Sequence, residues 1–196
     1  MPVATPAAVR SQIASGQVDP VYLLQGEDEV EKSALAHEFE ALVEEGLRAF
    51  NVERVHAIDV SSGEKMMQAV LSLSAVVRTL PMMVPRRVVL VLQADGLLAP
   101  KRESDAAERA WEELERLLTR PEPQTALVFV SGPLDKRSKV FKQFSKHATM
   151  VECGAIENLA DAERWVRNRV AAAGSQIEPQ GARLLAERAG PDVKRL

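Results

Sequence analysis

Short, wholly apolar runs are the feature that most constrains how this chain can fold. Residues 88–92 read Val-Val-Leu-Val-Leu, and residues 125–130 read Thr-Ala-Leu-Val-Phe-Val. A strand that is covered on one face alternates apolar and polar residues, whereas a strand buried on both faces is apolar throughout. The segments between these runs carry apolar residues at helical spacing, so helices are available to cover both faces. The pattern predicts a parallel sheet between two layers of helices.

The strand pattern stops before the chain does. We expect about five strands, over residues 20–24, 51–59, 88–92, 125–130 and 149–152. Two helices with no further strand follow them, over residues 159–173 and 179–189. This order is typical of an α/β fold with a five-stranded parallel sheet. We expect it to occupy residues 1–155, with a small helical domain over residues 156–196.

Composition narrows the class of protein. The 196 residues are 46% hydrophobic, which suffices for one main core and a small appendix. The net charge of −3 indicates neither a nucleic-acid binder nor a membrane-surface protein. The single cysteine, Cys153, cannot form an internal disulfide, and no apolar run approaches the roughly 20 residues of a membrane span. We expect a soluble cytoplasmic protein with no membrane contact.

Residues 26–33, GEDEVEKS, are close to the phosphate-loop pattern G-x-x-x-x-G-K-[ST]. Gly26, Lys32 and Ser33 fit, but Glu31 stands where the second glycine belongs. Four acidic residues crowd the segment, and each opposes a phosphate by roughly 4 kcal/mol at 4 Å and an effective dielectric near 20. The strand at 88–92 also lacks a carboxylate at its end for magnesium. A turn that no longer binds nucleotide is favoured, and a working nucleotide hydrolase is the alternative.

The stretch TLPMMVPRR, residues 79–87, places Leu80, Met82 and Met83 just before a predicted buried strand. Prolines stiffen the segment, and methionine is an adaptable apolar group that is frequent on binding surfaces. Two interpretations remain open. The methionines pack on the core of this protein, or they form an exposed plug for a partner's pocket, where burying the two yields roughly 3–6 kcal/mol before the costs of association.

A basic segment is the third candidate site. It carries five cationic residues and is predicted to be a helix over residues 136–146, with Lys136, Arg137, Lys139, Lys142 and Lys146. It is either a solvated amphipathic helix or a contact for a partner or a phosphate backbone.

Catalytic, metal and cofactor sites are not indicated. The three histidines are scattered without ligand spacing, and Cys153 has no histidine near it in sequence, which favours a structural thiol.

Taken together, these segments resemble the delta subunit of the bacterial DNA polymerase III clamp loader. The resemblance runs in order through YLLQGEDEVEKSAL (22–35), Phe50-Asn51, TLPMMVPRRVVLV (79–91), LDKRSKVFK (134–142) and the region from Trp165 through Gly174 to Gly190-Pro191-Asp192.

The resemblance implies an AAA+-like P-loop fold that does not hydrolyse ATP, followed by a helical lid and a helical collar. The 26–33 turn would then be the relic of an ATP site. Met82 and Met83, with Leu80 nearby, would insert into a hydrophobic pocket of the sliding clamp, the beta subunit. We expect a truncated lid without the collar, and a subunit that is not catalytic by itself.

The partners implied are the clamp, other clamp-loader subunits in the full-length protein, and primed DNA within the assembled complex. Two rivals remain, a P-loop NTPase with a degenerate phosphate loop and a DNA-binding module that uses residues 136–146.

Overall fold

The computed structural model describes residues 4–57, 60–98, 104–154 and 158–190. Three of the expected features lie outside these residues: the end of the second strand at Asp59, the domain boundary between residues 155 and 156, and the Pro191-Asp192 end of the resemblance.

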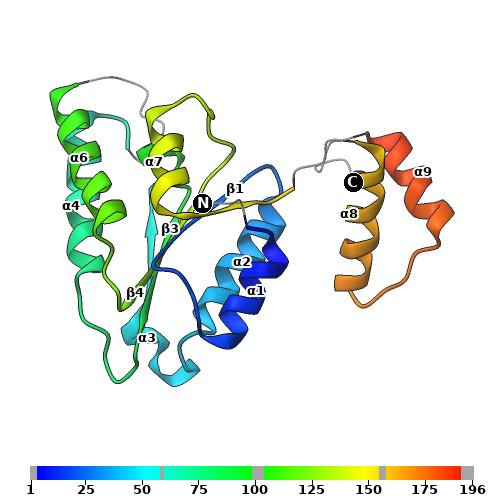
Figure 1. Ribbon diagram of the computed structural model, residues 1–196, viewed down its shortest axis with the longest axis horizontal. Helices are drawn as coiled ribbons and strands as arrows, with labels where there is room; N and C mark the ends of the chain where they lie inside the picture. Colours follow the sequence, from blue (N-terminus) through cyan, green and yellow to red (C-terminus); the bar gives the residue numbers. More distant parts are fainter. Residues whose placement is uncertain (1–3, 58–59, 99–103, 155–157, 191–196) are drawn as a thin grey trace.

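The sheet has five parallel strands in the order β2-β3-β4-β1-β5. Figure 1 shows the sheet between helices on its two sides. Their bounds are Val21–Gln25 (β1), Val52–His56 (β2), Arg87–Leu92 (β3), Thr125–Val130 (β4) and Thr149–Glu152 (β5). The α/β class, the number of strands and their parallel direction were all predicted from the apolar runs. β3, β4 and β1 lie inside the sheet, which explains why their sequences are continuously apolar.

Helices alternate with these strands. The long ones are α1 (Pro6–Ser15), α2 (Glu29–Glu40), α4 (Gly63–Val77), α6 (Asp105–Thr119), α7 (Lys139–His147), α8 (Leu159–Ala172) and α9 (Pro179–Ala189). Three short helical turns were not predicted, namely η1 (Glu45–Leu47), α3 (Arg48–Asn51) and α5 (Asp95–Leu98). Segments of three or four residues are too short to show a helical period.

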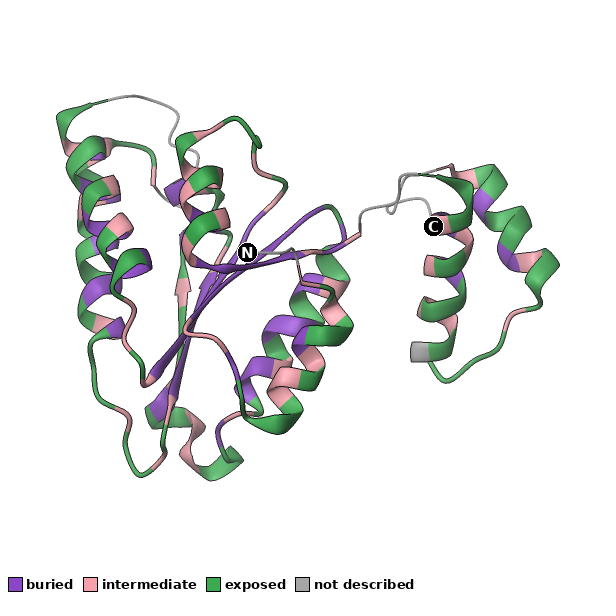
Figure 2. Cartoon of the chain, viewed as in Figure 1, coloured by how far each residue is buried: buried purple, intermediate pink, exposed green. Residues whose placement is uncertain are grey.

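Each strand contributes alternate side chains to two hydrophobic cores. In β1, Val21 and Leu23 face the core under α4, α6 and α7, while Tyr22 and Leu24 face the core under α1 and α2. β1, β3, β4 and most of β5 are therefore buried, whereas β2, at the side of the sheet, is half-buried or exposed and the helices are buried along one side only (Figure 2). This two-sided burial anchors the ends of β1, β3 and β4 within the molecule.

Only helices follow β5 within the described ranges, and α8 packs against α9. Every helix in the described part of the chain is too short or too polar to cross a lipid bilayer.

Candidate functional site

The turn between β1 and α2 is much shorter than a phosphate loop. β1 ends at Gln25 and α2 begins at Glu29 with Asp28 as its N-cap, so only residues 26–28 lie outside regular structure. In the phosphate-loop motif, the helix follows the loop, near the lysine. Here Lys32 is already the fourth residue of the helix, so this turn is too short to form an open loop around a phosphate.

Three backbone N–H groups in this turn and in the first turn of α2 are bonded within the protein. Asp28 N–H donates to the Cys153 carbonyl (3.3 Å), and Lys32 N–H donates to the Asp28 carbonyl (3.0 Å). Glu31 N–H donates to Asp28 Oδ1 at 2.9 Å. A phosphate site needs such groups free and turned towards the ligand. The Asp28 carboxylate instead supplies the negative charge that a helix N-terminus favours.

Lys32 is a structural residue in this arrangement, with 1% of its surface exposed. Its Nζ donates to Glu29 Oε1 and to the backbone carbonyl of Ser131, both at 2.8 Å. Ser131 directly follows β4. The ammonium group therefore ties α2 to the end of β4, while Ser33 is exposed on the helix surface.

Gly26 is required by a close backbone contact. Its φ is +124°, and a Cβ at this position would lie 2.0 Å from the Cys153 carbonyl oxygen. The Cys153 N–H donates to the Gln25 carbonyl at 2.7 Å, so the end of β5 lies directly against the turn. Burial, with a smaller contribution from the charge of Glu31, raises the pKa of the Cys153 thiol to about 12. A neutral, buried thiol of this kind fits a structural role.

The structure brings two of the predicted phosphate-loop residues, Lys32 and Ser33, to one cavity. Lys32, Ser33 and Asp95 all line a cavity of about 590 Å³ beside α2, at the edge of the sheet where the strands end. Ligands of open α/β sheets bind at this edge. Asp95 Oδ1, however, accepts a hydrogen bond from the Gly132 N–H (2.9 Å), which links the residues after β3 and β4.

The lysine and the arginine that line this cavity are both already paired with carboxylates. Besides Lys32, the cavity is lined by Arg54, which makes two hydrogen bonds to the buried carboxylate of Glu40 (2.8 and 2.5 Å). Each of these two cations thus faces a carboxylate of its own. An incoming triphosphate would have to displace one of these pairs, which disfavours nucleotide binding.

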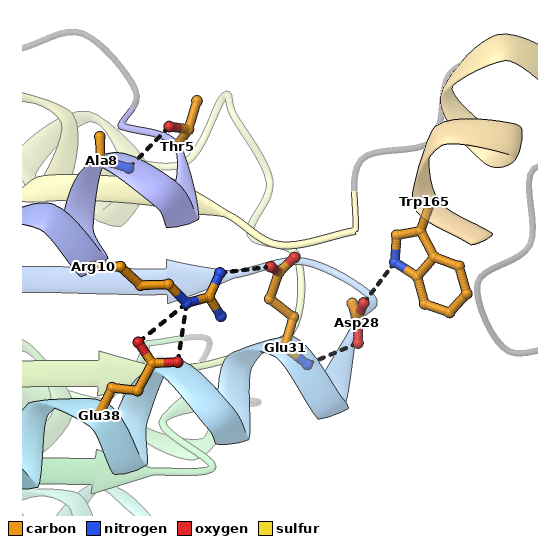
Figure 3. Close-up of polar contacts among 7 residues, drawn as sticks. All are labelled: Thr5, Ala8, Arg10, Asp28, Glu31, Glu38 and Trp165. Carbon is orange, nitrogen blue, oxygen red and sulfur yellow. Dashed lines mark hydrogen bonds and ion pairs between the residues drawn. The ribbon is translucent and has the colours of Figure 1, made fainter. Parts of the chain in front are cut away.

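Further polar contacts link α2 to α1 and α8 (Figure 3). Trp165 of α8 donates its indole N–H to Asp28 Oδ2 at 2.8 Å, so one carboxylate both caps α2 and contacts the last helices. Arg10 of α1 bonds Glu38 at 2.9 and 3.1 Å and Glu31 at 3.5 Å. Partial burial lowers the pKa of Arg10, but the bonds and charges of Glu38 and Glu31 outweigh it and leave the pKa raised.

The segment 79–86 lies at the other edge of the sheet, where it joins α4 to the start of β3. The exposed fractions of Leu80, Met82 and Met83 are 69%, 51% and 85%. These side chains therefore do not pack on the protein's own core, which was one of the two interpretations of the sequence. They form an apolar surface of the kind that marks interaction sites.

Hydrogen bonds hold this exposed segment at both ends. Thr79 Oγ1 donates to the Ala75 carbonyl (3.0 Å), and Arg87 Nη1 donates to the Thr79 carbonyl (3.4 Å). Arg86 Nη1 donates to the Val18 carbonyl at 2.6 Å. The backbone of the segment is thus fixed although its apolar side chains face solvent.

Phe50 and Asn51 belong to the same edge of the sheet, because they precede β2 as segment 79–86 precedes β3, and β2 pairs with β3 in parallel. The Phe50 side chain is exposed, and Asn51 is fully buried against Met82. The sequence placed residue 51 at the start of a strand, whereas it ends α3. Their only sequence signal was the match of Phe50-Asn51 to the clamp-loader pattern.

The basic segment is only partly helical, which corrects the predicted helix from residue 136. α7 begins at Lys139 with Ser138 as its N-cap, so Lys136 and Arg137 lie in the turn before it. The reason is local: Asp135 Oδ1 accepts the Arg137 N–H at 2.9 Å, a contact that competes with helix formation.

The basic side chains of this segment point to solvent. Lys136, Arg137, Lys139, Lys142 and Lys146 are all exposed. Lys139 Nζ lies 3.9 Å from Glu115 Oε2, a weak surface contact. These cations lie on the helix layer of α4 and α6, away from α1 and α2 (Figure 1).

Histidine, cysteine and carboxylate side chains in the described ranges do not form a group of three or more that could hold a metal ion.

Comparison with known proteins agrees with the geometry. The family model for DNA polymerase III, delta subunit, matches residues 22–154, which is more than half of the chain. The chain belongs to this family. The match spans all five strands and both the turn at 26–28 and segment 79–86. None of the curated proteins that were compared matches it.

Solved structures show the same fold. The Bacillus subtilis DNA clamp loader delta protein superposes with a TM-score of 0.67 and 21% identity, covering 97% of this chain and 54% of that one. A DNA polymerase III gamma subunit-related protein from Thermotoga maritima superposes with a TM-score of 0.51 and 12% identity, covering 92% and 59%. This member of the delta family thus spans about half the length of the Bacillus protein.

Proposed function

We propose that this chain is the part of a clamp-loader delta subunit that binds the sliding clamp of a bacterial replication complex. Met82 and Met83 enter a hydrophobic pocket of the clamp, with Leu80 beside them. The observation that carries the proposal is the exposure of these side chains on a segment whose backbone is held at both ends. Membership of the delta family supplies the class of partner.

Clamp opening would follow from differential binding. A ligand shifts an equilibrium only by the difference in its affinity for the two states. The segment must therefore fit the open or relaxed clamp better than the closed ring. Once the clamp is open at one interface, the assembled loader can place it on primed DNA, with ATP hydrolysed by other subunits.

The delta chain itself is proposed to be non-catalytic. This role is supported by the bonded N–H groups of Asp28, Glu31 and Lys32, by the burial of the Lys32 side chain and by the pairing of Arg54 with Glu40. A P-loop NTPase would instead need Lys32 and Ser33 to reach a bound phosphate. The helices after β5 would belong to a lid domain that spans residues 156–196. The protein would act in the cytoplasm with the other loader subunits.

Calorimetric titration with the sliding clamp of the same organism tests the proposal. Burying two methionine side chains yields roughly 3–6 kcal/mol gross, so Met82→Ala with Met83→Ala should weaken the affinity about 100-fold or more. The matched control is Leu184→Ala with Leu185→Ala, an exposed apolar pair on α9. Unchanged affinity of a folded Met82/Met83 variant would exclude this surface as the contact.

The basic segment is a second candidate contact, for DNA within the assembled complex. Its exposed cations, including Lys136, Arg137 and Lys142, are suited to phosphates rather than to bases. Replacing Lys142 and Lys146 by Gln should reduce DNA affinity and flatten its salt dependence by roughly one unit for each lost phosphate contact. An unchanged salt slope in fluorescence anisotropy with primed DNA would exclude the contact.

A further inference from the structure

The Asn51 side chain makes three hydrogen bonds, two of them to the backbone of the exposed segment 79–86. The side chain is fully buried. Its Oδ1 accepts the Met82 N–H at 2.7 Å, and its Nδ2 donates to the Met82 carbonyl at 2.9 Å. Nδ2 also donates to the Leu47 carbonyl at 3.0 Å, within the turn that precedes β2. Both donors and the acceptor of the amide are used.

These contacts fix the two peptide groups on either side of Met82. The N–H belongs to the peptide that joins Pro81 to Met82, and the carbonyl belongs to the peptide that joins Met82 to Met83. With both planes held, the direction of the Met82 side chain and the start of Met83 are set by a residue outside the segment. The other hydrogen bonds of the segment lie at its ends, at Thr79 and Arg86.

Met83 shows why such support is needed. Its φ is +61°, in the left-handed region that residues with a Cβ rarely adopt. A free segment would leave this conformation for a more favourable one. The same residue is also the most exposed of the three apolar side chains of this segment, so backbone strain and side-chain exposure coincide at Met83.

We propose that Asn51 is a positioning residue for clamp binding, which holds Met82 and Met83 in the conformation that the clamp pocket accepts. The inference rests on the proposed function of these methionines. A site that is held in its binding conformation avoids the loss of apparent affinity that follows when only a fraction of molecules is competent. Asn51 itself, being buried, does not touch the clamp.

The test combines clamp affinity with amide hydrogen exchange on the full chain. Asn51→Ala should weaken clamp binding about tenfold, through the two lost bonds to Met82. It should also speed exchange of the Met82 N–H, while the amides of β3 keep their protection. Asn51→Ser leaves a short, uncharged hydroxyl that can bond only one of the two Met82 groups, so it should weaken binding to a smaller extent and serves if the alanine variant does not fold.

The control is Arg48→Ala on the same short helix. Arg48 Nε donates to the Val43 carbonyl (3.0 Å) and has no hydrogen bond to segment 79–86 in the described structure. We expect clamp affinity within about twofold of the wild type for this variant. Equal weakening by Arg48→Ala and Asn51→Ala would mean that the helix as a whole matters, and would overturn the positioning role.

Failure of this inference differs from failure of the proposed function. The role of Asn51 alone is overturned if Asn51→Ala binds the clamp with wild-type affinity although its Met82 N–H exchanges faster, while the Met82/Met83 variant loses affinity. Wild-type affinity in the Met82/Met83 variant overturns the clamp contact, and the positioning role with it.

Discussion

Replacing Lys32 by methionine separates a structural lysine from a nucleotide-binding one. Methionine keeps the apolar stem, so packing changes little. The lost bond from the ammonium group to the buried Ser131 carbonyl contributes about 1.5–3 kcal/mol. The Glu29 side chain is 73% exposed, so the ion pair adds only about 0–1 kcal/mol. We expect the free energy of unfolding to fall by about 2–3 kcal/mol.

Urea denaturation followed by circular dichroism measures this change, provided that the slope with urea is the same in both proteins. Ser33→Ala is the matched control. Ser33 is exposed one residue further along α2, and alanine favours the helix, so stability should change by less than about 0.5 kcal/mol.

In a working phosphate loop the two substitutions would behave alike, because lysine and serine both act on the bound nucleotide. Both variants are therefore also titrated with Mg-ATP. The structural assignment of Lys32 would be refuted by two results together: Lys32→Met is as stable as the wild type, and the wild type binds ATP whereas both variants do not. The NTPase alternative would then be restored.

Two further predictions concern the contact between the turn and β5. Gly26→Ala should lower the free energy of unfolding by about 2–4 kcal/mol, because the added Cβ meets the Cys153 carbonyl and φ is positive, whereas Gly46→Ala, with open space around it, should be close to neutral in the same urea assay. For Cys153, the folded-state pKa of about 12 lies above the ordinary value of 9.0, so its contribution to stability is complete below pH 9 and is lost as pH rises towards 12. Unfolding free energies should therefore fall by about 1.4 kcal/mol more between pH 8 and pH 10 in the wild type than in Cys153→Ala, and equal slopes would contradict the assignment.

The core of the fold could be predicted from the sequence because a strand that is buried on both faces is apolar at nearly every position. The runs at β3 and β4 are apolar at nearly every position, and the ends of α1 are marked by Thr5 with Pro6 and by Gly16. The exposure of Met82 and Met83 could not be predicted from the pattern, since the same residues suit a core. Only the resemblance to the clamp-loader family favoured a partner's pocket.

What the sequence could not supply is the set of contacts between distant residues. The bond of Lys32 to Ser131 spans 99 positions, and that of Asn51 to Met82 spans 31. Neither pair has a motif, because an amide or an ammonium group can serve any carbonyl that the fold brings near. The start of α7 was missed for a local reason, as Asp135 bonds the backbone of its own turn.

The placement of the two notable segments at opposite edges of the sheet has a consequence for how this protein can change. The turn at 26–28 follows β1, whereas segment 79–86 precedes β3, so a strand's length of about 17–20 Å separates the edges. Substitutions that far apart, with no shared partners, add independently in free energy. A substitution at the 26–28 turn can therefore change stability without altering the apolar segment, and the reverse also holds. Directed evolution of the turn at 26–28 should therefore leave the properties of segment 79–86 unchanged, and the reverse.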